Sequence, residues 1–174
     1  MFKSVLVAID GSDHARKALR IAVDLAEHYK AKLNVLHVVT DRQVSAELRH
    51  MAEVEQLIKP VKEALPESGN VPGEMSRFFS DAALYDKITQ VATAVGQRIL
   101  DEAIATARAS TKIETHAILE HGDPANIILE CADRVRADLL VLGSRGLSNI
   151  EGVFRGSVST KASHAAQCTC LTVK

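Results

Sequence analysis

The run Val5-Leu6-Val7-Ala8-Ile9 constrains the fold of this chain more than any other feature of the sequence. All five side chains are apolar, so the segment predicts a strand over 2–9 that is buried on both faces, as strands of parallel sheets are. The turn Asp10-Gly11-Ser12 follows at once, and apolar residues then recur at helical spacing, with Ser12 or Asp13 as the N-cap. A second apolar run, Leu33 to Val39, completes a strand–helix–strand unit with a right-handed crossover.

Three more apolar runs continue this alternation of strands and helices. We expect strands over 113–119, 139–142 and 170–173, the first near a sheet edge because its apolar residues alternate. Asp123-Pro124 places an aspartate at a helix cap and a proline in the first turn, ahead of an apolar helical stripe. A shorter helix is expected over 158–166. Five strands with intervening helices predict an α/β fold with a doubly wound five-stranded parallel sheet.

The region over 41–110 differs from the rest, and we expect it to be a helical insert within a single domain that spans 1–174. Its first helix should end near Pro60. A longer helix over about 81–110 should bury a stripe of five residues: Ile88, Val91, Val95, Ile99 and Ala103. Gly96 lies inside this helix and costs about 1 kcal/mol of helix stability relative to alanine, so it marks either close packing or a bend.

The stretch from Leu139 to Thr160 carries the strongest indication of function. Gly143 ends a strand, Gly146 follows three residues later, and after nine more residues Gly156-Ser157 opens a helix. Glycines let backbone amides approach a ligand closely, and a helix start adds free N–H groups and the positive end of its dipole. Glycine and serine in a loop often indicate only a turn. Placed between a strand and a helix, they favour phosphate binding, although neither a Walker A loop nor a Gly-x-Gly-x-x-Gly fingerprint is present.

The spacing Gly143-x2-Gly146-x9-Gly156-Ser157 resembles the nucleotide-binding motif of the universal stress protein family, in its ATP-binding branch. The start of the chain through Ser12, and the segment His121-Gly122-Asp123-Pro124, are similar to parts of the same family. The resemblance covers 1–40 and 111–174. It implies a Rossmann-like, adenine nucleotide α-hydrolase-like sheet with strand order 3-2-1-4-5. It also implies a homodimer in which the C-terminal strands of two copies pair.

The motifs converge on one edge of the predicted sheet, because ligands of open parallel sheets bind at the carboxyl ends of the strands, where the strand order reverses. By the resemblance, Asp10 lies beside the phosphates or their Mg²⁺, which prefers few carboxylates plus phosphate oxygens. The backbone near Val39 and Gly122 would face adenine. The predicted ATP-binding residues are Asp10, Gly11, Ser12, Val39, Gly122, Pro124, Gly143, Ser144, Arg145, Gly146, Gly156, Ser157, Val158 and Ser159, with Asp10 also the candidate metal ligand.

Several of these residues have an equally simple structural interpretation. Asp10 also suits a turn or helix cap, and Arg145 and Arg155 either meet phosphates or are solvated surface residues.

Cys168 and Cys170 lie near His164, but a tetrahedral zinc site needs a fourth ligand, and the sequence offers none. We interpret these cysteines as small buried thiols, and we interpret Cys131, on a helical stripe, as a core cysteine.

Composition excludes several classes of protein. The net charge of −1 produces no field that attracts nucleic acid. The longest apolar runs have about five residues, far fewer than the roughly 20 that span a bilayer, and the sequence shows no signal-peptide apolar region. Three cysteines argue against a disulfide framework. We therefore expect a cytoplasmic protein with no nucleic-acid partner and no membrane insertion.

The sequence thus predicts an ATP-binding universal stress protein that acts as a nucleotide-sensing regulator in a stress response. Four charge-assisted hydrogen bonds of about 1.5–3 kcal/mol each, less an association cost of at least about 4 kcal/mol, allow micromolar affinity. No residue is nominated as a catalytic base, so any ATPase activity should be slow. One alternative is a slow ATP hydrolase or phosphotransfer enzyme of the same fold. Another is an interaction module without nucleotide, whose insert binds a regulatory protein.

Overall fold

The computed structural model describes residues 1–40, 73–146 and 156–174, with side chains from Asp86 onward in the second range. The expected helix that ends near Pro60 lies outside the described residues. Contacts between Cα atoms divide the chain into two compact units, of which unit 1 comprises Met1–Thr40 and Gly96–Lys174 and unit 2 comprises Asp41–Val95. The predicted single domain with an insert over 41–110 stays a prediction.

Unit 1 contains one sheet of five parallel strands, in the order β3-β2-β1-β4-β5. The predicted doubly wound α/β fold and its strand order are confirmed. The strands are β1 (Ser4–Ile9), β2 (Lys32–Val39), β3 (Thr115–His121), β4 (Leu139–Gly143) and β5 (Thr169–Val173). The helices are α1 (Asp13–Tyr29), α4 (Gly73–Ser110), which runs through both units, α5 (Pro124–Arg134) and α6 (Ser157–Ala165).

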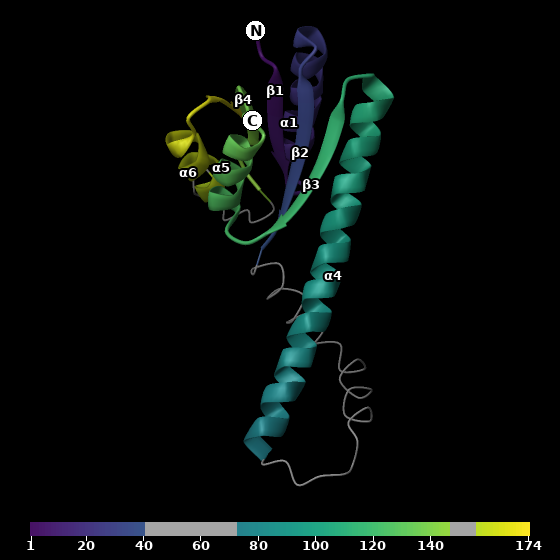
Figure 1. The fold of residues 1–174 in the computed structure, drawn as a ribbon, viewed down its shortest axis with the longest axis vertical. Coiled ribbons are helices and arrows are strands. Elements are labelled where there is room, and N and C mark those ends of the chain that lie inside the picture. The colour runs from purple at the N-terminus through teal and green to yellow at the C-terminus, as the bar shows by residue number, and fades with distance from the viewer. Residues whose placement is uncertain (41–72, 147–155) are drawn as a thin grey trace. The chain divides into compact units, whose positions relative to one another are not determined.

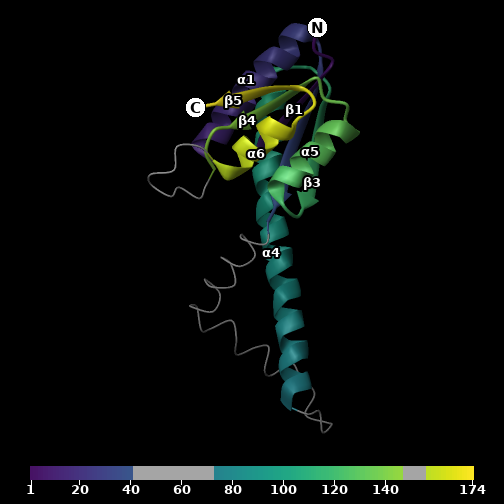
Figure 2. The same cartoon turned by 90° about the vertical axis from the view of Figure 1, so that its left-hand side faces the viewer.

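Helices cover both faces of this sheet (Figure 1). Val5, Val7 and Ile9 of β1 face a core cluster shared with α1 and with the part of α4 that belongs to unit 1. Leu6 faces the opposite cluster, which includes residues of α5 and α6, and Figure 2 shows these two helices on the same side of the sheet. Val5, Leu6 and Val7 are fully buried, and burial of each contributes about 1.5–3 kcal/mol, so β1 is a strand with two core faces as predicted.

Two helices begin at side-chain caps that the sequence predicts. The Ser12 Oγ accepts a hydrogen bond from the Ala15 N–H at 3.2 Å, which makes Ser12, rather than Asp13, the N-cap of α1. The Asp123 carboxylate accepts the Asn126 N–H at 3.0 Å, and Pro124 occupies the first turn of α5. Each cap satisfies one of the amide groups that a helix start leaves without an intrahelical partner.

Polar contacts tie β1 to its neighbours at the amino end of the sheet. The Asp138 Oδ2 atom accepts the backbone N–H groups of Lys3 at 2.7 Å and Ser4 at 3.0 Å, and these two bonds lower the pKa of the Asp138 carboxyl. From β2, the buried Asn34 Nδ2 group lies within hydrogen-bonding distance of the Ser4 Oγ at 3.2 Å and the Val5 carbonyl at 3.3 Å. Side chains therefore fix the start of β1 on both sides.

The buried face of α4 differs from the predicted stripe. Ile88 and Ala103 are buried as expected, but Val91 is 41% exposed and Val95 is 47% exposed, so the prediction is wrong for these two residues. Within unit 1 the helix presents four buried residues to the core: Leu100, Ala103, Ile104 and Ala107. The buried face includes the small residues Ala92 and Gly96, which a search for large apolar side chains overlooks.

Gly96 marks close packing against the carboxyl half of β2. A Cβ atom placed there would lie 2.8 Å from the His37 Cδ2 and 3.0 Å from both the His37 Nε2 and the Val39 Cγ2. His37 is only 1% exposed and so has little room to move.

Among the described residues, no helix is long and apolar enough to cross a membrane.

We predict that Gly96→Ala destabilises the protein although alanine is the better helix former. Overpacking costs about 1–3 kcal/mol, which outweighs a propensity gain of about 1 kcal/mol. Urea unfolding should show a lower free energy of unfolding for this variant. Gln97→Ala, at the neighbouring exposed position, should change that free energy by no more than about 0.5 kcal/mol. A stabilised Gly96→Ala variant would contradict the close packing.

Candidate functional site

The loops that follow β1 and β4 meet at the carboxyl edge of the sheet. The two strands pair in parallel from Val5↔Leu139 to Ala8↔Leu142, so both end at the same level. Beyond them, the Ser12 hydroxyl donates to the Arg145 carbonyl at 3.3 Å. The Ser12 backbone N–H donates to the Asp10 Oδ1 at 3.0 Å. One serine thus caps α1, joins the two loops and orients the Asp10 carboxylate.

Two glycines allow this close approach. A Cβ atom on Gly146 would lie 2.5 Å from the Asp10 Oδ2, so a side chain there would displace the carboxylate. A Cβ atom on Gly143 would lie 3.0 Å from the backbone of His14 and Ala15, at the start of α1. Both glycines therefore have a packing role in addition to the predicted role in phosphate access.

The start of α6 is fixed to the end of β4 by backbone groups and one hydroxyl. The Gly156 N–H donates to the Ser144 carbonyl at 3.0 Å, and the Ser144 N–H donates to the Val173 carbonyl at 2.7 Å. The Ser159 hydroxyl lies 3.3 Å from the Ser144 carbonyl oxygen and 3.1 Å from that of Gly156. Ser159 is buried, so its hydroxyl stabilises this junction, and its predicted contact with phosphate stays a prediction.

Helix α6 begins without a side-chain cap. Gly156 is its N-cap residue and supplies no side-chain acceptor, unlike Ser12 for α1 and Asp123 for α5. The first turn begins with Ser157 and Val158, and the Val158 side chain packs against the α5–α6 core. Besides the Ser157 hydroxyl, this turn contributes backbone N–H groups to the edge of the sheet, and these favour an anion.

A second group of predicted residues lies at the ends of β2 and β3. The Gly122 N–H donates to the Val39 carbonyl at 3.1 Å. Gly122 has a φ of 137°, which L side chains rarely adopt, and Pro124 begins α5 two residues later. The predicted site residues therefore form two groups at one edge. One surrounds the ends of β1 and β4, and the other joins β2 to β3. Arg155 lies outside the described residues.

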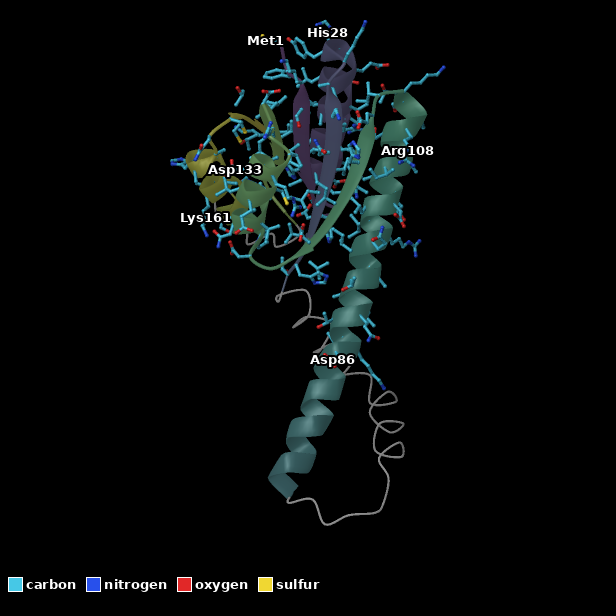
Figure 3. The ribbon with its side chains drawn as sticks, viewed as in Figure 1. Met1, His28, Asp86, Arg108, Asp133 and Lys161 are labelled. Atoms are coloured by element: carbon cyan, nitrogen blue, oxygen red, sulfur yellow. The ribbon has the colours of Figure 1, made fainter. Side chains whose placement is uncertain are left out.

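Two ion pairs lie near this edge, and the side chains of both are exposed. Arg16 bonds both the Asp13 carboxylate and the Gly11 carbonyl, and its guanidinium lowers the pKa of Asp13. On the other face of the sheet, Lys161 of α6 pairs with Asp123 at 3.4 Å (Figure 3 labels Lys161). The hydrogen bond from the Asn126 N–H lowers the pKa of the Asp123 carboxyl, and the bond from Lys161 lowers it by a smaller amount. Both ion pairs are exposed, so each contributes little to stability.

The donor set at this edge suits a metal only in combination with ligand oxygens. Among the described residues, no cluster of three or more His, Cys, Asp or Glu side chains could hold a metal ion. Asp10 could supply one carboxylate to Mg²⁺, and phosphate oxygens and water would complete its coordination.

The cysteines take structural positions. Cys131 is buried in the core as predicted, and burial raises its pKa. Cys168 and Cys170 are only partly buried, against the prediction of buried thiols, and pack beside the α5–α6 cluster. Burial raises the pKa of both thiols, so few thiolates form near neutral pH.

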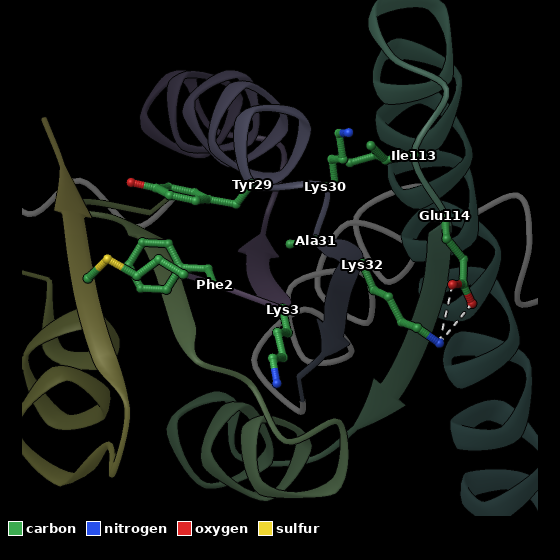
Figure 4. A pocket seen from close by; sticks show the side chains of 9 residues that line it. Phe2, Lys3, Tyr29, Lys30, Ala31, Lys32, Ile113 and Glu114 are labelled. Carbon is green, nitrogen blue, oxygen red and sulfur yellow. Dashed lines mark hydrogen bonds and ion pairs between the residues drawn. The ribbon is translucent and has the colours of Figure 1, made fainter.

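A pocket of about 540 Å³ lies at the opposite, amino end of the sheet (Figure 4). It is lined in part by Lys3, by Lys32, whose Nζ lies 3.2 Å from the Glu114 carboxylate, and by the edge-to-face pair of Phe2 and Tyr29. Ligands of parallel sheets bind at the carboxyl ends of strands. We therefore place the candidate site at the carboxyl edge rather than in this pocket.

Comparison with known proteins agrees with this architecture. The sequence profile described as "Universal stress protein family" matches residues 1–174. The chain belongs to the universal stress protein family. The chain is 32% identical to the universal stress protein YxiE of Bacillus subtilis over 174 residues, with 100% of both chains covered. It is 33% identical to the stress response protein NhaX of the same organism over 175 residues, with 98% of this chain and 96% of the relative covered.

Solved structures of the family share this fold. The universal stress protein UspA from Lactobacillus plantarum superposes with a TM-score of 0.62 at 22% identity, covering 99% of this chain and 97% of the other. A universal stress protein solved in complex with cAMP gives a TM-score of 0.62 at 26% identity, with the same coverage. The fold deduced from the strand pattern is therefore that of the family.

One residue with a specific contact at this edge was not singled out from the sequence. His37 is one of seven scattered histidines in the sequence. In the structure its ring lies between the end of β1 and Gly96 of α4. The only sequence signal was its position near the end of a buried strand, which does not indicate the atom that it contacts.

We predict that Gly146→Ala and Asp10→Ala interact in a double-mutant cycle. In the wild-type background the new methyl group displaces the Asp10 carboxylate from the hydrogen bond that Ser12 donates to it, and losing a bond to a charged group costs about 1.5–3 kcal/mol. In the Asp10→Ala background the opposing oxygen is absent, so most of that cost should vanish. Urea unfolding of the four proteins measures the coupling, expected at about 0.5–3 kcal/mol.

A control cycle should combine Asp10→Ala with Ser163→Ala on α6. The changes that these two substitutions make in the free energy of unfolding should add. If the costs of Gly146→Ala and Asp10→Ala also add, the close approach of the two loops is refuted.

Proposed function

We propose that this universal stress protein binds ATP at the carboxyl edge of its sheet and acts as a nucleotide-sensing regulator. The observation that carries the proposal is the meeting of three motifs that are distant in sequence. The turn Asp10–Ser12, the loop Gly143–Gly146 and the uncapped start of α6 are joined by hydrogen bonds. Glycine-flanked amides and a helix start are a common arrangement for phosphate recognition.

The phosphate chain would lie on the β1–β4 side of the edge. Backbone N–H groups of Gly11 and of the first turn of α6 would donate to phosphate oxygens, with the Ser157 hydroxyl and Arg145 as further donors. Asp10 would hold Mg²⁺ jointly with those oxygens. Bound Mg²⁺ would neutralise phosphate charge, which allows a carboxylate and a triphosphate to share one site.

Adenine would lie on the β2–β3 side, facing the backbone of Val39 and Gly122. The chain has no tryptophan and only six other aromatic residues, four Phe and two Tyr, so an aliphatic slot is the natural environment for the base. A family member 26% identical to this chain was solved with cAMP, which supports recognition of an adenine nucleotide. The number of phosphates on the nucleotide that this protein binds is a question for the experiment below.

We propose further that two copies pair through β5, which forms one edge of the five-stranded sheet. The Thr169 N–H donates to the Asp138 carbonyl at 3.2 Å, and the Val173 carbonyl accepts from Ser144. Backbone groups of neighbouring strand residues point to opposite edges, so the amides of Cys170 and Thr172 point away from β4. They are available to a second β5. A cytoplasmic location and a regulatory protein partner remain predictions from the sequence.

We predict that the purified protein contains, or binds with micromolar affinity, an adenine nucleotide. Acid extraction followed by mass spectrometry identifies any molecule that co-purifies, and Mg²⁺–ATP is then titrated into stripped protein. At 100 times Kd the ligand stabilises the fold by about 2.7 kcal/mol, equivalent to about 5–10 °C in Tm. ADP, AMP and cAMP compared in the same assay rank the phosphate requirement.

The matched variants for this test are Asp10→Asn and Asp13→Asn. Each removes one carboxylate near the start of α1, but only Asp10 is predicted to contact Mg²⁺–ATP. We expect Asp10→Asn to weaken Mg²⁺–ATP binding by about tenfold, the loss of one charge-assisted contact, and Asp13→Asn to have little effect. Equal effects, or no binding to the wild-type protein, would reject the proposal. Steady ATP turnover abolished by Asp10→Asn would instead favour an enzyme.

We predict that Thr172→Pro converts the dimer into a monomer. Proline removes the outward amide of β5 without removing a bond to β4, as is typical for proline at sheet edges. Thr172→Val keeps that amide and should keep the dimer. Light scattering coupled to size-exclusion chromatography measures the mass of each variant. If Thr172→Pro stays a dimer with wild-type stability, the two copies associate through a surface other than β5.

A further inference from the structure

The ring of His37 is fixed against the last residue of β1. Parallel pairing places His37 of β2 beside Ile9 of β1, and the His37 Nδ1 lies 2.8 Å from the Ile9 carbonyl oxygen. A carbonyl oxygen only accepts, so Nδ1 carries the proton. The next residue along the chain, just after β1, is Asp10. The bond therefore holds the peptide group from which the predicted phosphate turn begins.

The other edge of the same ring lies against α4. A Cβ atom on Gly96 would lie 2.8 Å from the His37 Cδ2 and 3.0 Å from the Nε2. The Nε2 atom is buried and has no hydrogen-bond partner in the part of the chain that the structure describes. Burial lowers the pKa of His37, against opposing contributions from the Ile9 carbonyl and Asp10, which agrees with a neutral ring.

Helix α4 also lies beside the turn Asp10–Ser12 through Ile99, three residues after Gly96. Gly11 has a φ of 83°, and a Cβ atom placed on it would lie 3.5 Å from the Ile99 Cδ1. Positions i and i+3 lie on the same face of a helix. One face of α4 therefore supports His37 at Gly96 and covers Gly11 with Ile99, so the turn is held from β2 and from α4.

We propose that His37 is a positioning residue for the nucleotide site. Through its bond to the Ile9 carbonyl, it holds the end of β1 so that the Asp10 carboxylate and the amides of Gly11 and Ser12 stay in place. The backing of its ring by Gly96 couples that geometry to α4. The proposal rests on the proposed function for its effect on ATP, but its effect on the turn can be measured without nucleotide.

Asn34 provides a matched control at the other end of the same strand. Like His37, it is a buried polar residue of β2, and its side chain reaches a β1 carbonyl, that of Val5, at 3.3 Å. Its contacts lie at the amino end of the sheet, opposite the candidate site. A purely structural role predicts similar consequences for the loss of either side chain, whereas a positioning role predicts an effect on the turn only for His37.

The test compares His37→Leu, His37→Asn and Asn34→Leu in the full chain. Asparagine places an amide nitrogen near the position of Nδ1, so His37→Asn keeps the donor to Ile9. Two quantities are measured for each variant. The first is hydrogen exchange of the Ser12 amide without nucleotide, because this amide donates to Asp10 and reports the geometry of the turn. The second is the Kd for Mg²⁺–ATP.

We expect His37→Leu to speed Ser12 exchange and raise the Kd for ATP by about tenfold each, equivalent to one lost buried hydrogen bond. His37→Asn should restore both to within about threefold of wild type, and Asn34→Leu should leave both within about twofold. Equal effects of His37→Leu and Asn34→Leu, or unchanged Ser12 exchange in His37→Leu, would overturn the proposal.

Two further outcomes separate the proposals. If the wild-type protein binds no ATP while His37→Leu alone speeds Ser12 exchange, the proposed function fails and the positioning of the turn stands. If His37→Leu does not fold, His37→Gln replaces it, because glutamine keeps a polar amide but moves the donor away from the Nδ1 position. Rapid Ser12 exchange in His37→Gln and slow exchange in His37→Asn would then support the proposal, and equal exchange would overturn it.

Discussion

The central position of β1 between β2 and β4 is the constraint on which the rest of the structure depends. Pairing with β4 brings the Asp10 turn to the loop from Gly143, although more than 130 residues separate them. Pairing with β2 brings His37 to the Ile9 carbonyl. Because β1 is apolar on both faces, its register depends on polar contacts at its start, where Asp138 accepts the N–H groups of Lys3 and Ser4 and Asn34 lies against the Val5 carbonyl.

Much of this arrangement could be predicted from the sequence because it depends on local chemistry. Apolar runs indicate the five strands, and the caps at Ser12 and Asp123 follow from side-chain oxygens next to helical stripes. The strand order came from the family resemblance carried by the spacing of Gly143, Gly146 and Gly156. The meeting of the Asp10 turn with the β4 loop was expected from the rule for parallel sheets.

The rest depends on distances that a sequence does not contain. The exposed positions of Val91 and Val95 show that the orientation of a long helix cannot be read from its large apolar residues when small ones face inward. Gly146 was assigned to phosphate access, yet a side chain there would also collide with Asp10. The contact of His37 with Ile9 requires the β1–β2 register, so the sequence alone gave no reason to prefer it to the other histidines.

The bonds from Asp138 to Lys3 and Ser4 have a consequence for how the chain folds. They join groups 135 and 134 residues apart, whereas β1, α1 and β2 are adjacent in sequence. Contacts between distant residues form slowly, because the intervening chain must close first. We therefore expect the local unit to assemble before β4 docks beside β1. The edge at which Asp10 and Gly146 meet therefore forms only when β4 has paired with β1.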